Sequence, residues 1–216
     1  MEYESLINYE CITTYLRGLI PQRDEKLAKL EQECREAQLP IVRPETAEFL
    51  ELLCMLKKPT KILEIGTCVG FSALLMVNAS PQLEKLITID RYPYMIERAK
   101  KNFEAFEEKR ITLMEGQAAD ILKELDTGFD IVFLDAAKGQ YPVFLPDCLR
   151  LLNKGGLFIA DNVLFDGVIA DEKRAVRRDR TIVNRLKQFL KEISENPELK
   201  TSILPLGDGL SVSYKK

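Results

Sequence analysis

The sequence predicts an α/β fold, in which helices cover both faces of a largely parallel sheet. The main observation is that short apolar runs alternate with helical segments from Lys61 to Asp161. Strands that alternate with helices form βαβ units, which place successive strands parallel to one another. A second observation is the length of 216 residues, of which 46% are hydrophobic and 30% charged. These values are typical of a globular chain that buries a full core without disulfides.

One domain is expected, with a helical part at residues 1–58 and a core at residues 59–216. Apolar residues recur at helical spacing over residues 6–19. A charged helix is expected over about residues 24–38, and Pro44 suits the first turn of a third helix.

Five β-rich runs alternate with helical segments in the expected core. The expected strands are Lys61–Ile65, Leu86–Asp90, Arg110–Met114, Asp130–Asp135 and Gly156–Asp161. The expected helices between them lie near residues 71–79, 93–107, 117–125 and 141–152. The tail should form a helix from about Arg178 to Glu195 and then a hairpin of Lys200–Leu204 and Leu210–Tyr214. This hairpin predicts an antiparallel strand at the edge of the sheet.

The absence of histidine excludes several kinds of enzyme site. Ser-His-Asp and Cys-His nucleophilic catalysis are excluded, as are zinc or iron centres that use histidine ligands. The five cysteines include no CxxC pair, which argues against a disulfide framework and favours a reducing cytoplasm. No apolar run approaches the about 18 residues of a membrane span, so no membrane partner is expected.

A strand, a glycine turn and a helix start are expected over residues 62–72, with the sequence ILEIGTCVGFS. Gly66 and Gly70 let the backbone turn and pass close to a ligand. Asp90 ends the next strand, where an acid can hydrogen-bond ribose hydroxyls. The GxxxG spacing differs from the GxGxxG of NAD-binding proteins, and Glu64 suits a cationic nucleoside. The pattern therefore favours S-adenosylmethionine over NAD, with a purely structural turn as the alternative.

Two other expected strands end in residues that could bind a metal ion. Asp135 follows the run IVFL, and Asp161 and Asn162 follow the run LFIA. If these strands are neighbours, their carboxyl ends bring three oxygen donors together, which suits Mg²⁺, with Mn²⁺ and Ca²⁺ as alternatives. Lys138 lies three residues beyond Asp135 and could take a proton from a substrate hydroxyl. The competing interpretation is ordinary polar residues at strand ends and an exposed loop lysine.

These motifs resemble, in the same order, those of the cation-dependent class I O-methyltransferases, which include the catechol and caffeoyl-CoA O-methyltransferases. The matching segments are LEIGTCVGFSALLM, ITID, FDIVFLDAAKGQY, LLNKGGLFIADNVLFDG and LPLGDGLSVS. The resemblance implies a Rossmann-like fold with a seven-stranded, mostly parallel sheet and a reversed last strand. It also implies S-adenosylmethionine as donor, a divalent metal, and N-terminal helices that cap the site and join two subunits.

The resemblance also implies a role for each matching residue. The cofactor-binding residues would be Val42, Glu64, Gly66, Ser72, Asp90, Ala118 and Asp135. The metal ligands would be Asp135, Asp161 and Asn162, and Lys138 would be the catalytic base. The catechol enzymes have a serine at the position of Ala118 and an aromatic residue near Ala136 and Ala137. These differences argue against a catechol-shaped pocket.

The tail, with the segments DNVLFDG and RRDRTIVNR, is most similar to the bacterial tRNA 5-hydroxyuridine methyltransferases. This similarity implies methylation of 5-hydroxyuridine at the tRNA wobble position. Residues 171–187 contain seven basic and three acidic residues, a net +4, which leaves −7 for the rest of a chain of net −3. The residues expected to contact the tRNA anticodon loop are Arg177, Arg178, Arg180 and Arg185. The alternatives are a solvated helix face and a contact to coenzyme A phosphates in a small-molecule O-methyltransferase.

Overall fold

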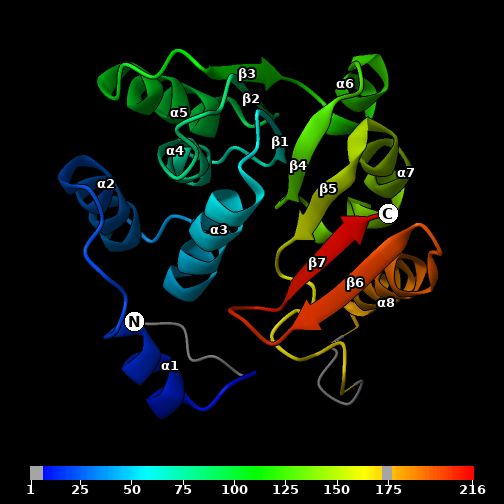
Figure 1. Ribbon diagram of the computed structural model, residues 1–216. Coiled ribbons are helices and arrows are strands. Elements are labelled where there is room, and N and C mark those ends of the chain that lie inside the picture. The colour runs from blue at the N-terminus through cyan, green and yellow to red at the C-terminus, as the bar shows by residue number, and fades with distance from the viewer. Residues whose placement is uncertain (1–6, 172–176) are drawn as a thin grey trace.

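The structure is a computed structural model that describes residues 7–171 and 177–216. Its strands are β1 (Lys61–Ile65), β2 (Lys85–Asp90), β3 (Ile111–Glu115), β4 (Phe129–Leu134), β5 (Leu152–Ala160), β6 (Leu199–Leu204) and β7 (Leu210–Lys215). They form a single seven-stranded sheet in the order β3-β2-β1-β4-β5-β7-β6 (Figure 1). The order changes direction between β1 and β4, and ligands bind at this kind of crevice in open α/β sheets.

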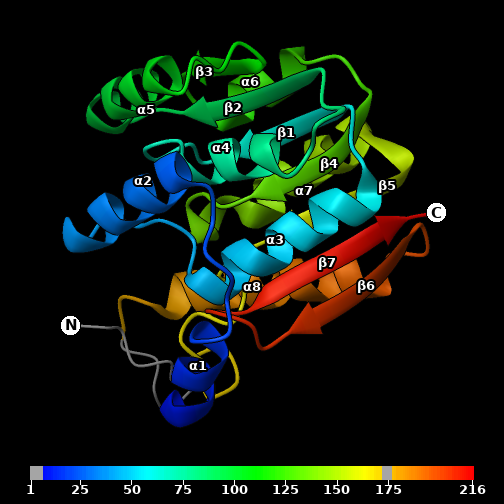
Figure 2. The ribbon, with the colours of Figure 1, turned by 60° about the vertical axis from the view of Figure 1, so that its left-hand side comes forward.

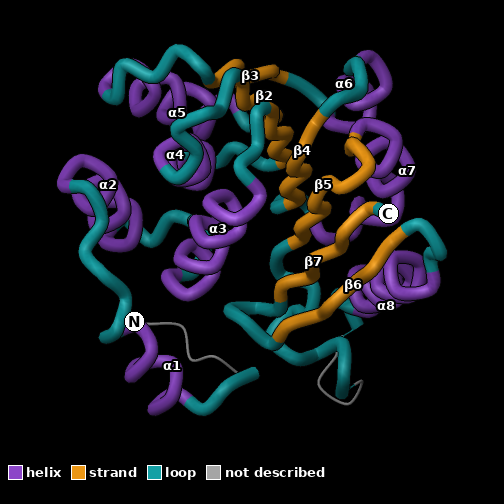
Figure 3. Tube along the Cα trace, viewed as in Figure 1, coloured by secondary structure: helices purple, strands orange, loops and turns teal. Residues whose placement is uncertain are grey.

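Helices cover both faces of the sheet (Figures 1 and 3). The helices are α1 (Glu10–Arg17), α2 (Glu25–Glu36), α3 (Pro44–Lys57), α4 (Phe71–Asn78), α5 (Pro93–Ala105), α6 (Ala118–Glu124), α7 (Tyr141–Leu151), α8 (Arg180–Glu195) and the short 3₁₀ helix η1 (Lys138–Gln140). Helices α2 to α5 share one apolar core with the sheet, and α6 to α8 share the other. Over the described residues, none of the helices combines the length and apolarity that crossing a membrane requires.

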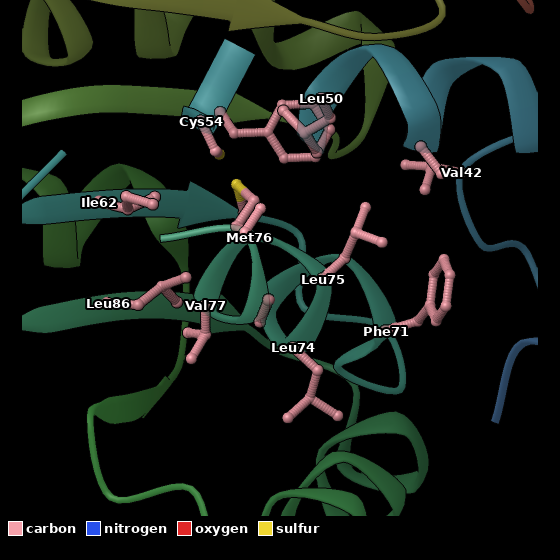
Figure 4. Close-up of a cluster of buried hydrophobic side chains, with 14 of the residues drawn as sticks. Val42, Leu50, Cys54, Ile62, Phe71, Leu74, Leu75, Met76, Val77 and Leu86 are labelled. Atoms are coloured by element: carbon pink, nitrogen blue, oxygen red, sulfur yellow. The ribbon is translucent and has the colours of Figure 1, made fainter. Parts of the chain in front are cut away.

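The central strands β1 and β4 are buried on both faces of the sheet, and neighbouring residues along each strand point to opposite cores. In β1, Ile62 belongs to the core under α3 and α4, whereas Leu63 belongs to the core under α7 and α8. Figure 4 shows the first of these cores, where side chains of α3 such as Leu50 meet side chains of α4 such as Met76. These two cores fix the strand ends that carry the candidate site.

The reversed last strand is confirmed, but it does not lie at the edge of the sheet as the sequence indicated. Strand β7 is antiparallel to both of its neighbours, pairing Tyr214 with Leu157 of β5 and Ser213 with Thr201 of β6. The edge is β6, which runs parallel to β5. The hairpin therefore folds its second strand inward, so that β7 is hydrogen-bonded on both sides.

The expected boundaries of most elements are close to the observed ones, and β1 matches to the residue. Strand β5 is the main exception, because it begins at Leu152 and not at Gly156. The pairing of β4 with β5 shifts register between Phe129 and Ile131, and Gly155 takes a left-handed φ of +76°. A bulge at this glycine continues the strand where the sequence predicted a break.

The N-terminal helices differ in how much they bury. Helix α2 places Leu27 and Leu30 in the core, whereas α1 buries none of its residues and exposes Ile12 and Leu16. An ion pair at 2.8 Å between Arg17 and a glutamate of α3 ties α1 to the rest of the fold. Figure 2 shows α1 at the lower edge of the molecule, apart from the sheet.

Candidate active site

A cleft of about 1320 Å³ opens at the carboxyl ends of β1, β2, β4 and β5. Eight of the residues predicted from the sequence line this cleft. They are Val42, Gly66, Asp90, Ala118, Asp135, Lys138, Asp161 and Asn162. The structure therefore brings most of the expected cofactor residues and all the expected metal ligands to one cleft, whereas Glu64 and Ser72 are buried and do not line it.

The turn after β1 requires glycine for two different reasons. Gly66 has a φ of +108°, and a Cβ there would lie 1.9 Å from the carbonyl oxygen of Asp135. The floor of the cleft is thus backbone of β1 packed directly on backbone of β4. Gly70 has a φ of +84°, and a Cβ there would lie 2.4 Å from the ring of Phe103 on α5. Gly66 therefore shapes the cleft, and Gly70 allows α4 to begin against α5.

Asp90 ends β2 and points a fixed carboxylate at the cleft. Its oxygens accept hydrogen bonds from the backbone N–H groups of Cys68 at 2.9 Å, Arg91 at 2.7 Å and Tyr92 at 3.0 Å. This carboxylate is in the position that holds ribose hydroxyls in doubly wound sheets.

Glu64 lies fully buried beneath the glycine turn. It accepts hydrogen bonds at 2.5 Å from the hydroxyls of Ser72 and Thr88. Burial raises the pKa of Glu64 to about 7, although both hydrogen bonds favour the ionised form. A cationic ligand above the turn would favour ionisation of Glu64, and Ser72 contacts this carboxyl rather than the cleft.

Asp135 and Asp161 follow the neighbouring strands β4 and β5. The backbone N–H of Asp161 donates to the carbonyl of Leu134 at 3.0 Å, which fixes the two strand ends side by side. Burial raises the pKa of Asp135 to about 7, and the neighbouring carboxyl of Glu64 adds to this shift. Burial and the charge of Asp135 raise the pKa of Asp161 well above its ordinary value. A cation beside these two acids would favour the ionised form of both.

The donor set suits a hard cation. Asn162 has a left-handed φ of +56°, and its backbone N–H donates at 2.7 Å to one carboxylate oxygen of Asp161. Two carboxylates and an amide leave room for waters or substrate oxygens around Mg²⁺. Across residues 7–171 and 177–216 there is no group of three or more His, Cys, Asp or Glu side chains that could hold a metal. The expected site thus depends on the amide of Asn162, and its metal stays a prediction.

Lys138 lies in η1, and its side chain pairs with a residue that the sequence analysis did not select. Its Nζ lies 3.2 Å from an oxygen of Asp208, in the turn between β6 and β7. Asp208 is only 3% exposed, and its other oxygen accepts the backbone N–H of Asp166. The sequence feature that could have indicated Asp208 is the segment LPLGDGLSVS, in which an aspartate between two glycines predicts a turn.

Tyr141 is a second residue that the sequence analysis missed. It is fully buried at the start of α7, and its hydroxyl donates to the backbone carbonyl of Asp161 at 2.9 Å. Its ring contacts Phe189 of α8 edge-on, with 5.3 Å between ring centroids. The sequence feature that could have indicated Tyr141 is its position at the end of the segment FLDAAKGQY, three residues after Lys138.

The predicted RNA-binding residues fall into two groups. Arg177, Arg178 and Arg180 are exposed at the start of α8. Arg185 is half-buried, and its guanidinium donates to the carbonyl oxygen of Gly139 in η1 at 2.7 Å. The other basic residues of this segment include Lys173 and Arg174, which lie outside the described residues. Within this basic segment, Arg185 therefore contacts the turn that carries Lys138.

Comparisons with known proteins show the family of this chain. A sequence profile of the O-methyltransferase family matches residues 21–216. A catechol O-methyltransferase of Niastella koreensis is 32% identical over 96% of this chain and 98% of its own length. A provisionally assigned caffeoyl-CoA O-methyltransferase from Staphylococcus aureus has a TM-score of 0.89 and 29% identity, covering 96% of this chain and 100% of that one. An O-methyltransferase from Bacillus cereus, solved with S-adenosylhomocysteine, has a TM-score of 0.82 and 26% identity, covering 95% and 97% of the two chains.

The fold and the cleft define an S-adenosylmethionine-dependent O-methyltransferase. The sheet with its reversed last strand is the sheet of such an enzyme, and Gly66 and Asp90 line the cleft at its strand ends. The chain belongs to the O-methyltransferase family.

Proposed function

We propose that this chain catalyses the Mg²⁺-dependent O-methylation of 5-hydroxyuridine at the wobble position of tRNA, forming 5-methoxyuridine. The observation that carries the proposal is the meeting, in one cleft, of the glycine turn at Gly66 with the acids Asp135 and Asp161. Lys138 lines the same cleft. An acceptor hydroxyl beside these acids would therefore share one cavity with the methyl donor and with a proton acceptor.

The chain's own residues orient the reaction. The methyl group passes from the sulfonium of S-adenosylmethionine to the acceptor oxygen, and the hydroxyl proton passes to the Nζ of Lys138. The resulting ammonium is stabilised by Asp208, whose carboxylate oxygen lies 3.2 Å away. Alignment of the acceptor oxygen with the methyl group supplies most of the rate gain.

The proposed metal would be held by Asp135, Asp161 and Asn162. When bound, Mg²⁺ supplies Lewis-acid chemistry that lowers the pKa of a bound hydroxyl and orients two neighbouring acceptor oxygens. The support for it is the pair of acids at neighbouring strand ends. Desolvation raises the pKa of both carboxyls, and the charge of Asp135 raises that of Asp161 further, so a cation between them would favour their ionised form.

The choice of tRNA as acceptor is supported by charge and position. The arginines Arg177, Arg178 and Arg180 are exposed where α8 begins, and α8 packs against the turn of Lys138. Exposed arginines at the start of a helix that contacts the turn of Lys138 suit the phosphates of a single-stranded anticodon loop. In such a loop a base can leave the stack and enter a pocket.

Mass analysis of tRNA nucleosides tests the proposal. A tRNA that carries 5-hydroxyuridine is incubated with the protein, S-adenosylmethionine and Mg²⁺, in parallel with a sample that contains a chelator. We expect 5-hydroxyuridine to be replaced by 5-methoxyuridine, and the chelator to abolish the conversion until Mg²⁺ is restored. Unchanged tRNA in an assay where a catechol is methylated would refute the tRNA acceptor.

A small-molecule acceptor is the second candidate, and a specific observation favours it. The relative from Niastella koreensis, at 32% identity, is named as a catechol O-methyltransferase. A caffeoyl-CoA-type acceptor would place its phosphates on the same exposed arginines. Catechol and caffeoyl-CoA therefore belong in the same assay as the tRNA.

We also propose that two copies of the chain associate through their N-terminal helices. Large apolar side chains are exposed on both α1 and α3. They are Ile12, Leu16, Leu52, Met55 and Leu56. Adjacent apolar side chains of this kind are typical of a protein–protein interface.

A further inference from the structure

The turn that carries Lys138 is attached to α8 by one arginine. The guanidinium of Arg185 donates from Nη1 to the carbonyl oxygen of Gly139 at 2.7 Å. The turn itself is closed by a 2.7 Å bond from the N–H of Gln140 to the carbonyl of Ala137. A hydrogen bond with a charged donor is stronger than one between neutral groups, so Arg185 is the main polar link between α8 and η1 among the bonds described here.

Packing supports this link. A Cβ on Gly139 would lie 4.0 Å from both the Cδ of Arg185 and the Cγ1 of Ile182, so α8 lies directly against the turn. Helix α8 is in turn fixed in the core, because Leu186 and Phe189 are fully buried. A rigid helix therefore presents the guanidinium to the turn.

The same helix supports the acid on the other side of the cleft. Phe189 contacts the ring of Tyr141, and the hydroxyl of Tyr141 donates to the carbonyl of Asp161 at 2.9 Å. Helix α8 thus connects to the backbone of Asp161 through aromatic side chains and to the backbone of Gly139 through Arg185. Helix α8 therefore contacts the turn that carries Lys138 directly and the backbone of Asp161 through Tyr141.

We propose that Arg185 is a positioning residue for methyl transfer, which acts through Lys138 and not by contact with an acceptor phosphate. The inference rests on the proposed role of Lys138 as the base. Arg185 holds the backbone at Gly139, one residue after Lys138, while Asp208 holds the tip of the lysine side chain. Without Arg185, the Nζ loses its fixed place relative to the acceptor hydroxyl.

Hydrogen exchange tests the attachment without any acceptor. We expect Arg185→Met to speed amide exchange in the peptide that covers residues 137–141, while the thermal midpoint and the affinity for S-adenosylhomocysteine stay close to those of the parent protein. Lys191→Met is the matched control, because it removes a positive charge from an exposed position of the same helix. Equal exchange in the two variants and the parent protein would overturn the proposal.

A double-mutant cycle tests whether Arg185 acts through Lys138. The acceptor is an anticodon stem-loop that carries 5-hydroxyuridine, or a catechol if the RNA is not methylated. We expect Arg185→Met to lower kcat about 10- to 100-fold, with little change in KM for S-adenosylmethionine. Arg185→Lys, whose ammonium can reach the same carbonyl, should recover part of the rate.

The cycle separates this inference from the proposed function. In a Lys138→Met background we expect Arg185→Met to cause no further loss of kcat, because both changes remove the same contribution. If the losses of kcat from the two substitutions multiply in the double variant, the proposed role of Arg185 is overturned, whereas the proposed role of Lys138 as base is unaffected. An unchanged kcat in the single variant Lys138→Met would refute the proposed base, and the inference with it.

Discussion

At the scale of single residues, the candidate site combines acids at the ends of buried strands with side chains that reach it from distant parts of the chain. Residues that end buried strands, such as Asp90 and Asp161, were predictable because strand ends follow from local patterns. Asp208 was not predictable, because it reaches Lys138 from 70 positions away in the chain. The role of Arg185 at Gly139 likewise depends on a contact across 46 positions. Contacts of this kind are set by the packing of α8 and the β6–β7 turn and leave no local pattern.

Glu64 gives a prediction about pH. Its pKa rises from 4.5 to about 7 on folding because the carboxyl is buried. In the free protein the folded state keeps a proton that the unfolded state has released above pH 4.5, so stability falls as pH rises from about 4.5 to 7. Cationic S-adenosylmethionine favours the ionised carboxylate, so its affinity should increase between pH 6 and pH 8, in a range set by the pKa of about 7.

Calorimetric titration at both pH values measures this effect. We expect S-adenosylhomocysteine, which lacks the sulfonium charge, to show a smaller pH dependence. We also expect Glu64→Gln to bind S-adenosylmethionine more weakly, with a reduced pH dependence. A residual slope should remain, because the pKa of Asp135 is also about 7. A slope that is undiminished in Glu64→Gln would show that Glu64 does not sense the cofactor charge.

At the scale of secondary-structure elements, the first half of the sheet followed closely from the sequence. Strand β1 matched its expected bounds because its apolar run ends at a glycine turn. Strand β5 was expected too late, because a bulge at Gly155 keeps the strand continuous through two glycines. A glycine in the sequence therefore does not distinguish a turn of the chain from a bulge in a paired strand.

The junction between β1 and β4 gives a prediction about stability. Gly66→Ala places a Cβ 1.9 Å from the carbonyl oxygen of Asp135, whereas Gly128→Ala meets nothing within 4 Å at a similar φ of +117°. Both variants carry the cost of a left-handed residue, so their difference isolates the clash. We expect Gly66→Ala to lose at least about 2 kcal/mol more of unfolding free energy. Denaturant titration measures both values, and equal losses would contradict the close approach of the two strands.

At the scale of the whole molecule, the sequence predicted the layers and the resemblance supplied the strand number, which the structure confirms. The sequence did not show that β7, and not β6, pairs with β5, because the two strands of a hairpin have the same alternation of apolar and polar residues. The arrangement places the glycine turn at Gly66 and the acids Asp135 and Asp161 around one cleft. Charge and assembly at this scale lead to two predictions.

The basic segment predicts the salt dependence of RNA binding. Changing Arg177, Arg178 and Arg180 to glutamate should weaken tRNA binding and reduce the slope of log affinity against log salt concentration. Filter binding at several salt concentrations measures both quantities, and catechol turnover serves as the control for an intact active site. If tRNA binding is unaffected while a small phenol is methylated more slowly, the RNA assignment is wrong.

The exposed apolar residues of α3 predict the oligomeric state. Leu56 is 71% exposed, so Leu56→Glu should leave the fold intact and convert a dimer into a monomer. Val143→Glu is the matched control, because Val143 is 48% exposed on α7, away from α1 and α3. Light scattering after size-exclusion chromatography measures the mass of each variant. A parent protein that is monomeric, or a dimer that survives Leu56→Glu, would contradict this interface.

The central claim is that two neighbouring strand ends present Asp135, Asp161 and Asn162 to one hard cation beside the methyl donor. Crystals grown with Mn²⁺ and S-adenosylhomocysteine test it by anomalous diffraction. We expect a single anomalous peak at about 2.0–2.3 Å from an oxygen of each of the three side chains, next to the cofactor sulfur. Well-ordered cofactor with no peak between these side chains would contradict the account.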